Sequence, residues 1–320
     1  MQELACAGGR VAATIEGMKV SCRITFLIVL PVIGHGAQKQ AVRPPVRITL
    51  EQQVQAALHG FHGKVNLFAK NIDTGRAFGY HPDEKVRTAS TIKLPLIAAA
   101  FEAITEGKAS WDDRVTLREE DKVSGAGILP EFSAGDTLTL RALSHLMIVL
   151  SDNTATNLML DHFSDDYVNE WAEHFGMPNT KFLRKIGGAS PSKAAFDPQY
   201  APYGLGVSTS REMVKLMEGF ETGIVVNPEA SKEIISILKR QQDRNGIPRK
   251  LNGLEVANKT GALDHLRSDV GVVYSKKGRI VMAITCDDIP EVDWSTDNPG
   301  YLKIADLAEI LVKGLSHFPE

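Results

Sequence analysis

The sequence contains little cysteine. Its 320 residues include three, at Cys6, Cys22 and Cys286. The first two lie in a stretch that we interpret as a removable leader, and an exported protein left with one thiol has no internal disulfide. Cys286 follows an apolar run at 280–284. We therefore expect Cys286 to be a buried residue at the end of a strand rather than a nucleophile.

The sequence also lacks a strong excess of either charge. The formal net charge is −3, and 23% of the residues are charged. A nucleic-acid-binding protein usually shows a marked basic balance, so we expect no nucleic-acid partner. A hydrophobic fraction of 43% is ordinary for a globular protein and allows a large core. We expect a monomer that acts on a small-molecule substrate.

No apolar run is long enough to be a mature membrane anchor. A basic stretch at 18–23 precedes an apolar run at 24–33, and small residues follow at Gly34, Gly36 and Ala37. This order is typical of a secretory signal, and the run is shorter than a membrane-spanning helix. We predict a leader over residues 1–37, with Met18 as an alternative start and an uncleaved anchor as the competing interpretation. The mature chain would then be periplasmic or secreted.

Strand-like segments lie toward both ends of the chain, with helical patterns between them. Strands are predicted at 64–69, 76–80, 254–259, 270–274 and 280–285. Helices are predicted at 51–58, 90–106, 139–150, 154–163, 167–175, 230–241 and 301–315, and another begins near 208, where Thr209 and Glu212 resemble a capping box.

The simplest architecture pairs the two terminal sets of strands into one antiparallel sheet. The predicted fold is therefore α/β (α+β), with an antiparallel sheet flanked by helices plus an all-helical domain. The sheet part covers about 46–88 and 208–320, and the helical part about 89–207, together one domain over 38–320. A turn-rich stretch at 108–138 is expected to form a wall of the site between them.

Ser90 and Lys93 open the apolar helix at 90–106. Residues three apart share a helix face, so both side chains should point the same way. A serine hydroxyl needs a base to become a nucleophile, and a lysine can supply one if burial or a nearby cation keeps it neutral. The same spacing occurs at Ser190/Lys193 and at Ser236/Lys239, so the pair alone is weak evidence.

Two further motifs single out the first pair. Ser151, Asp152 and Asn153 form a polar corner between two apolar helices, where Asp152 could simply cap the second one. The only Lys-Thr-Gly of the chain begins at Lys259, at the predicted end of a strand. The order Ser-x-x-Lys, Ser-Asp-Asn, Lys-Thr-Gly holds for Ser90 alone, since the other two pairs follow residue 153.

With these motifs, the sequence resembles the class A β-lactamase family of penicillin-recognising serine hydrolases. The resemblance runs from about residue 51 to 315 and implies a β-lactamase/transpeptidase-like fold. It also implies that Ser90 is the acylated nucleophile, Lys93 its base, and Ser151 the donor of a proton to the leaving nitrogen.

The resemblance further implies the substrate-binding residues. Asn153 would bind the amide carbonyl of the substrate, and Lys259 and Thr260 would hold its carboxylate. The backbone N–H groups of Ser90 and Ala262 would form the oxyanion hole, next to Gly261 of the same motif. Arg267, shortly after this motif, would assist carboxylate binding.

One family feature is missing from the sequence. The family carries a glutamate after Ser-Asp-Asn that activates the deacylating water, but no glutamate lies between Glu173 and Glu212. The only acid in this stretch, Asp197, lies in a Phe-Asp-Pro context that we interpret as a turn rather than as a substitute base.

Three functions therefore stay open. The first is a β-lactam hydrolase, the second a D-Ala-D-Ala carboxypeptidase or esterase on the same scaffold, and the third a covalent β-lactam binder with little turnover. No cofactor and no metal are expected, because His59 and His62 lie in a glycine-bearing turn without other ligands. The Asp-Thr-Gly at 73–75 also occurs in aspartic proteases, but we interpret it as a turn between two strands.

Overall fold

The computed structural model describes residues 48–188 and 190–316, and these residues belong to one compact unit. The predicted leader at 1–37, with Cys6 and Cys22, lies outside the described residues. Among the helices that are described, none has the length and apolar character needed to cross a membrane.

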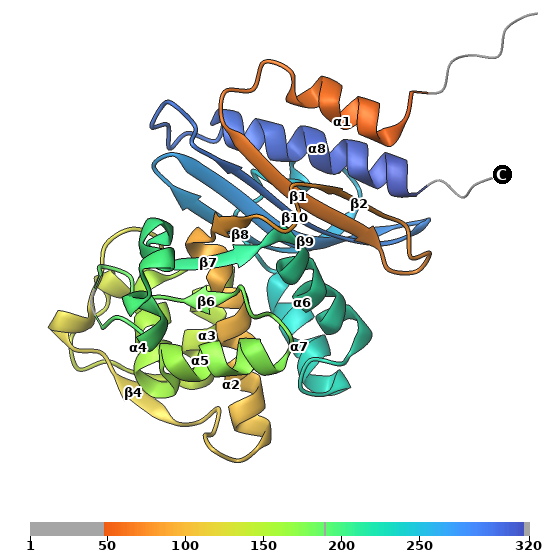
Figure 1. The fold of residues 1–320 in the computed structure, drawn as a ribbon. Helices are drawn as coiled ribbons and strands as arrows, with labels where there is room; N and C mark the ends of the chain where they lie inside the picture. Colours follow the sequence, from red (N-terminus) through yellow and green to blue (C-terminus); the bar gives the residue numbers. More distant parts are fainter. Residues whose placement is uncertain (1–47, 189, 317–320) are drawn as a thin grey trace, which may run out of the picture. The chain divides into compact units, whose positions relative to one another are not determined.

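A five-stranded antiparallel sheet in the order β2-β1-β10-β9-β8 joins the two ends of the chain (Figure 1). Its strands are β1 (Lys64–Asn71), β2 (Ala77–Tyr80), β8 (Glu255–Leu263), β9 (Leu266–Ser275) and β10 (Gly278–Asp287). β1 pairs with β10, with Val65 opposite Cys286. The prediction of one antiparallel sheet built from both terminal sets is confirmed. β8 lies at the edge of this sheet.

Helices cover both faces of the sheet. Successive side chains of each strand point to opposite faces, and both faces are apolar. On one face, Val256, Val273 and Met282 pack with α1 (Leu50–Leu58) and α8 (Pro299–Leu315). Cys286 is fully buried in this core near the end of β10, as predicted. The opposite face, which includes Ala257 and Val272, packs against α6 (Ser210–Thr222) and α7 (Pro228–Leu238).

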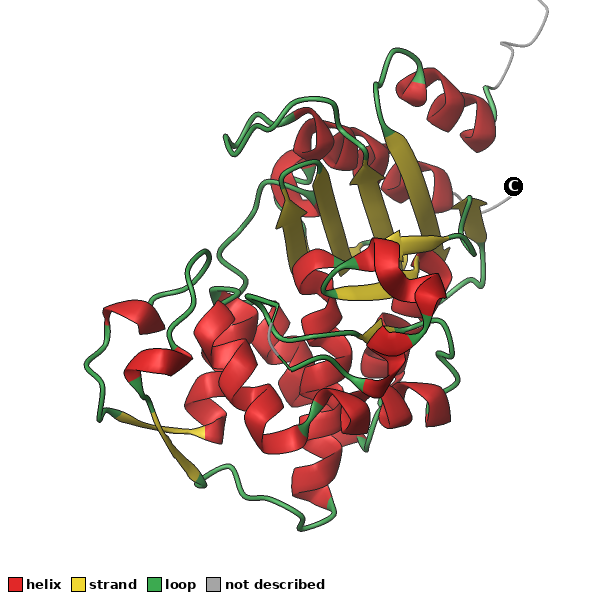
Figure 2. Cartoon of the chain, turned by 60° about the vertical axis from the view of Figure 1, so that its left-hand side comes forward, coloured by secondary structure: helices red, strands yellow, loops and turns green. Residues whose placement is uncertain are grey.

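The remaining helices form the helical part, seen below the sheet in Figure 2. They are α2 (Lys93–Thr105), α3 (Leu140–Val149), α4 (Asn153–Phe163) and α5 (Asp165–His174). α2 is buried over almost its whole length, as expected for a helix that is apolar on all sides. α6 and α7 share one continuous apolar core with these four helices and with one sheet face.

Short elements complete the chain, and the sequence pattern did not reveal them. One three-stranded sheet joins β3 (Lys85–Arg87), β7 (Gly206–Thr209) and β6 (Lys181–Phe182), and one pair joins β4 (Arg114–Thr116) and β5 (Thr137–Thr139). The 3₁₀ turns are η1 (Ala89–Ile92), η2 (Glu119–Asp121), η3 (Leu129–Glu131), η4 (Lys193–Phe196), η5 (Pro198–Tyr203) and η6 (Ile247–Lys250). Strands of two to four residues are too short to show an alternating pattern.

The capping box predicted at the start of α6 is only half formed. Thr209 Oγ1 accepts the N–H of Glu212 at 3.1 Å, as predicted. The Glu212 carboxylate, however, accepts hydrogen bonds from the Asn179 side chain at 2.8 Å and from Thr180 Oγ1 at 2.6 Å. The box is wrong because Glu212 is buried and satisfies the turn at 177–180 instead of its own helix cap.

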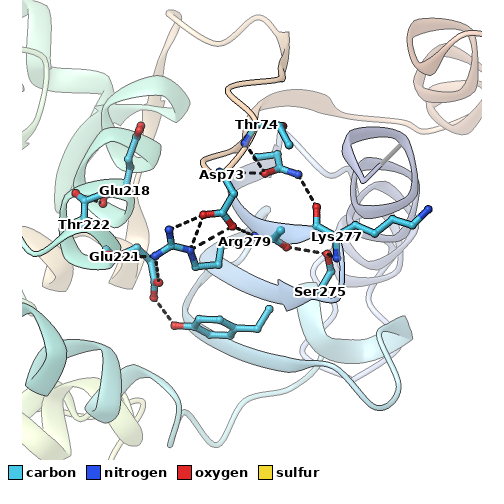
Figure 3. Close-up of polar contacts among 11 residues, drawn as sticks. Asp73, Thr74, Glu218, Glu221, Thr222, Ser275, Lys277 and Arg279 are labelled. Carbon is cyan, nitrogen blue, oxygen red and sulfur yellow. Dashed lines mark hydrogen bonds and ion pairs between the residues drawn. The ribbon is translucent and has the colours of Figure 1, made fainter. Parts of the chain in front are cut away.

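The Asp-Thr-Gly segment is a turn between β1 and β2, as predicted (Figure 3). Gly75 has a φ of +77°, which a glycine adopts readily. The Asp73 carboxylate accepts the Arg279 backbone N–H at 2.7 Å and its Nε at 3.0 Å, and this guanidinium holds the pKa of Asp73 below its usual value. Arg279 also donates to Glu221 of α6, which accepts the Tyr274 hydroxyl as well. These bonds fasten the turn to β9, β10 and α6.

Candidate active site

Ser90 lies in η1, directly before α2. The predicted helix is correct, but its first turn is 3₁₀, with the Lys93 N–H bonded to the Ser90 carbonyl. The preceding residue, Ala89, has a φ of +47°, a left-handed conformation that is unfavourable for a residue with a side chain. Such strain is tolerated where the surroundings fix the backbone, and it often marks a functional position.

Lys93, the first residue of α2, is fully buried and reaches the Ser-Asp-Asn corner. Its Nζ donates to the Ser151 carbonyl at 2.7 Å and lies 3.2 Å from both Ser151 Oγ and Asn153 Oδ1. The structure thus joins two motifs that are 58 residues apart in the sequence.

Lys259 approaches the same serine from the sheet. Its Nζ lies 2.9 Å from Ser151 Oγ and donates to the Thr260 carbonyl at 2.7 Å. Ser151 has a φ of +57°, so its hydroxyl is held on a second left-handed backbone. The Ser151 hydroxyl therefore lies between the side-chain nitrogens of two buried lysines, Lys93 and Lys259.

Lys93 and Lys259 are both buried, but their pKa values differ. Loss of solvation lowers the pKa of Lys93 well below its usual value, the charge of Lys259 lowers it further, and Asp152 opposes the shift. The pKa of Lys259 is lowered to about 8 by burial, while Asp269 and Asp243 oppose that shift. Near neutral pH, Lys259 keeps its proton and Lys93 is driven toward the neutral amine, which can act as a base.

Asp152 caps α4, which confirms the simpler interpretation of this residue. Its Oδ1 accepts the Ala155 N–H at 2.8 Å. Its Oδ2 also accepts the N–H groups of Ile128 at 2.7 Å and Leu129 at 2.9 Å. Asp152 is fully buried, so one carboxylate fixes both the start of α4 and the neighbouring segment.

The segment that Asp152 holds is part of the predicted wall. Asn153 Nδ2 donates to the Ser124 carbonyl at 3.1 Å, and the Asn153 N–H donates to the Ala126 carbonyl at 2.9 Å. Gly127 has a φ of +115°, and a Cβ there would lie 2.2 Å from Asp152 Oδ2. A glycine is required at this close approach, which places Gly125 and Ala126 at the pocket surface.

The Lys-Thr-Gly motif lies within β8, not at the end of the strand as predicted, because the strand continues to Leu263. Its glycine allows a close approach to the nucleophile: a Cβ on Gly261 would lie 2.8 Å from the Thr88 carbonyl oxygen and 3.1 Å from Ser90 N. β8 can therefore run directly against η1, which brings Ala262 next to Ser90.

Arg267 does not occupy the predicted position. Its side chain is fully buried and donates to the carbonyls of Leu263 at 2.5 Å and Leu266 at 2.6 Å, and to that of Asp293. Trp294 covers the guanidinium, with its ring centroid 4.8 Å from Cζ. The prediction that Arg267 binds a substrate carboxylate is wrong for this structure, because the guanidinium is enclosed and bonded to the backbone.

These residues surround a pocket of about 850 Å³. Six of the predicted residues line it, namely Ser90, Ser151, Asn153, Thr260, Gly261 and Ala262, while Lys93 and Lys259 are buried beneath its surface. The prediction missed other lining residues, including Gln242, Asp243, Leu263, Trp294 and Tyr301. Trp294 is 62% exposed in an irregular segment that no periodic pattern marks.

Among the described residues that line this pocket, the one carboxylate is Asp243. It accepts hydrogen bonds from Asn245 N at 3.0 Å and from the Tyr301 hydroxyl at 3.1 Å. Asp197 lies elsewhere, where it caps η5 and accepts the Gln199 N–H at 3.0 Å, so its interpretation as a turn residue is confirmed. No described residue of the 177–207 stretch lines the pocket.

No group of three or more potential metal-ligating side chains occurs within residues 48–188 and 190–316. His59 and His62 are exposed there.

Sequence comparison matches residues 49–315 to the β-lactamase enzyme family (Beta-lactamase2). A β-lactamase of Bacillus licheniformis is 27% identical over 268 residues, which cover 80% of this chain and 80% of that protein. β-Lactamase L2 of Stenotrophomonas maltophilia is 25% identical over 268 residues, which cover 81% of this chain and 84% of that protein.

Solved structures share the fold. A β-lactamase from Sphaerobacter thermophilus superposes with a TM-score of 0.73 at 28% identity and covers 85% of this chain and 98% of its own. PBP-A gives 0.71 at 26% identity over 85% and 96%. A class A β-lactamase from Mycobacterium abscessus gives 0.73 at 19% identity over 84% and 100%. The predicted β-lactamase/transpeptidase-like fold is thus confirmed, and, because the family match spans most of the chain, the protein belongs to the β-lactamase enzyme family.

Proposed function

We propose that this protein is a serine acyl-transfer hydrolase that opens β-lactam rings through an acyl-enzyme on Ser90. The observation that carries the proposal is the position of the Ser151 hydroxyl, 3.2 Å from Lys93 Nζ and 2.9 Å from Lys259 Nζ, at the pocket that Ser90 lines. The relatives from Bacillus licheniformis and Stenotrophomonas maltophilia are β-lactamases, which supports the same substrate class.

In the proposed reaction, neutral Lys93 takes the hydroxyl proton of Ser90, whose oxygen attacks the lactam carbonyl carbon. The N–H groups of Ser90 and Ala262 stabilise the oxyanion. When the C–N bond breaks, Ser151 gives its proton to the nitrogen and is reprotonated by Lys93. Water then attacks the ester and releases the opened acid, which restores the Ser90 hydroxyl.

The remaining residues would bind the substrate. Asn153, which the 124–126 backbone fixes, would contact the amide carbonyl of the acyl side chain. Protonated Lys259 and the Thr260 hydroxyl would hold the carboxylate, with Gly261 keeping β8 close to η1. A carboxylate suits this subsite because a buried ammonium gains from an anionic partner.

A D-Ala-D-Ala carboxypeptidase or esterase is the second candidate. Its support is the pocket lining, in which Asp243 is the one carboxylate among the described residues. A peptide acyl group can pass to water or to an amine without the glutamate that the β-lactamase family uses. A covalent β-lactam binder with little turnover is the third candidate and rests on the same observation.

A chromogenic cephalosporin combined with intact-mass detection tests the proposal. Sustained colour change that disappears in Ser90→Ala, together with an adduct of the opened drug on the native chain, would support it. A stable adduct at one equivalent without turnover would favour the binder, and release of D-Ala from a D-Ala-D-Ala peptide would favour the carboxypeptidase. If Ser90 forms no adduct with any β-lactam or acyl ester, acylation at this residue is refuted.

The acylation rate should follow a bell-shaped pH profile whose alkaline limb responds to Asp269. Activity rises as Lys93 loses its proton and falls as Lys259, with a pKa of about 8, loses the charge that holds the substrate. Asp269 is buried, has a pKa raised to about 7, and favours the charged form of Lys259. In Asp269→Asn, the pKa of Lys259 drops, so the alkaline limb should move to lower pH.

Stopped-flow acylation rates between pH 5 and about 10 measure both limbs. Asp264→Asn, an exposed acid in the same hairpin, is the matched control and should leave the profile in place. An alkaline limb that does not move in Asp269→Asn would show that Lys259 is not the group that titrates there.

We also propose that the chain acts after export, as a monomer. The proposal rests on the leader pattern at 1–37 and on a pocket that the described part of one chain lines by itself.

A further inference from the structure

A second concavity, which we call the basic groove, adjoins the catalytic pocket. It has a volume of about 550 Å³ and shares Val149, Gln241 and Gln242 with the pocket. Five residues line the groove but not the pocket, namely Lys239, Arg240, Arg244, Glu255 and Val256, and Arg240 and Arg244 lie in the connection from α7 to β8. A ligand in the pocket can therefore extend past these shared residues into the groove.

The two guanidinium groups have no carboxylate partner among the described residues. Both side chains are exposed; Arg240 lies 3.4 Å from His145 Nε2, and Arg244 donates to the Val256 carbonyl at 3.3 Å. Burial and the charges of Arg240 and Arg141 lower the pKa of His145, so its ring carries no positive charge near neutral pH.

The acids around the groove are already bound to other groups. Glu255 pairs with Lys239 at 2.7 Å, and Glu233 pairs with Arg141. Asp243 accepts the hydrogen bonds from Asn245 and Tyr301 described above. Since the partners of Asp243 are neutral, its one negative charge opposes the two positive charges of Arg240 and Arg244, which leaves an excess of positive charge beside the catalytic pocket, in a chain whose net charge is −3.

Hydrogen bonds hold the floor of the groove in place. The Gln241 side chain is buried and donates to the Ile148 carbonyl at 2.8 Å, and the Gln242 N–H donates to the Val149 carbonyl at 3.1 Å. These bonds fasten the connection to the end of α3, two residues before Ser151. A floor fixed in this way spares a ligand part of the ordering cost.

We propose that the basic groove binds an anionic group on the leaving part of the substrate, beyond the carboxylate held by Lys259 and Thr260. The inference rests on the proposed function, since Ser151 would protonate the leaving nitrogen, and the groove shares Val149, two residues before Ser151, with the catalytic pocket. The acyl group would lie on the other side, against Asn153, Gly125 and Ala126, which also line the pocket. The preferred substrates would be acyl donors with a second carboxylate on the departing portion.

A matched pair of cephalosporins tests the inference. They differ only in an arylthio substituent at the 3′ position, which carries a carboxylate in one compound and a carboxamide in the other. We expect the native chain to acylate with the carboxylate compound about five times faster at low salt, given the modest strength of exposed ion pairs. The preference should vanish in the double variant Arg240→Gln/Arg244→Gln and shrink at high salt.

The control is Lys232→Gln/Lys276→Gln, which removes the same charge from two exposed positions outside the groove and should keep the preference. Equal rates for both compounds in the native chain would overturn the inference but leave acylation of Ser90 intact. Calorimetric binding to Ser90→Ala separates the two proposals: tighter binding of the carboxylate compound that needs both arginines supports the groove, even if no acylation occurs. Equal binding of the two compounds overturns it.

Discussion

Replacing Lys93 with methionine is expected to slow acylation of Ser90 by about 10³-fold, within the usual range for loss of a general base. Methionine retains much of the volume of the buried side chain but cannot accept the Ser90 proton. It also removes the group that lies 3.2 Å from Ser151 Oγ, so return of the proton to the leaving nitrogen fails as well. The rate of adduct formation with a chromogenic cephalosporin, followed by quenched intact-mass spectra, measures the effect.

The chain supplies its own control for this substitution. Lys193 belongs to a second Ser-x-x-Lys pair, but its side chain is 85% exposed and its Nζ lies 3.5 Å from Asp166. Lys193→Met should acylate at the native rate. Since Lys93 is buried, thermal unfolding of the Lys93→Met variant must show a folded chain. A folded variant that acylates within a few-fold of the native rate would assign the base to another group.

The acyl-enzyme on Ser90 is expected to persist, with deacylation slower than acylation by about 10²-fold or more, the lower end of what one general base contributes. The reason is the absence of a glutamate from the described pocket lining, where Asp243 is the one carboxylate and already accepts three hydrogen bonds. A water near the ester thus has no free carboxylate to activate it. Acylation by a penicillin should then appear as a burst of one equivalent followed by a slow steady state.

Stopped-flow absorbance gives the burst amplitude, and mass spectrometry gives the adduct lifetime. Asp243→Asn should leave that lifetime unchanged, because Asp243 is assigned no part in deacylation. Linear kinetics without a burst would contradict the prediction. A lifetime that lengthens strongly in Asp243→Asn would instead identify this residue as the water activator.

The sequence was sufficient for the elements whose patterns are long. The strands at 64–69 and 280–285 and the helix at 90–106 carry enough apolar residues to be recognised, and β1 does pair with β10. The contacts of Ser151 with Lys93 and Lys259 could be predicted only from the order of the motifs. They join residues 58 and 108 positions apart, and such contacts leave no local sequence signal.

Other features depend on the three-dimensional environment alone. The position of Arg267 shortly after Lys-Thr-Gly suggested that it binds the substrate. That role requires an exposed guanidinium, and Trp294 covers the guanidinium of Arg267. Asp243 and Trp294 reach the pocket from irregular segments, where neither period nor motif identifies them. Gly127 lies in the predicted turn-rich stretch at 108–138. The reason that this position must be a glycine is the close approach of buried Asp152, which only the structure shows.

The pairing of β1 with β10 has a consequence for how the chain becomes active. Lys64 lies opposite Asp287, so the sheet cannot close until residue 287 has been synthesised. Lys259, whose Nζ lies 2.9 Å from Ser151 Oγ, belongs to β8, which joins the same sheet through β9. Before closure, Lys93 is solvated and carries its proton, and Ser90 has no base. Unfolded chains, in which Lys93 is not buried and Lys259 does not lie beside Ser151, should therefore be unreactive toward acyl donors.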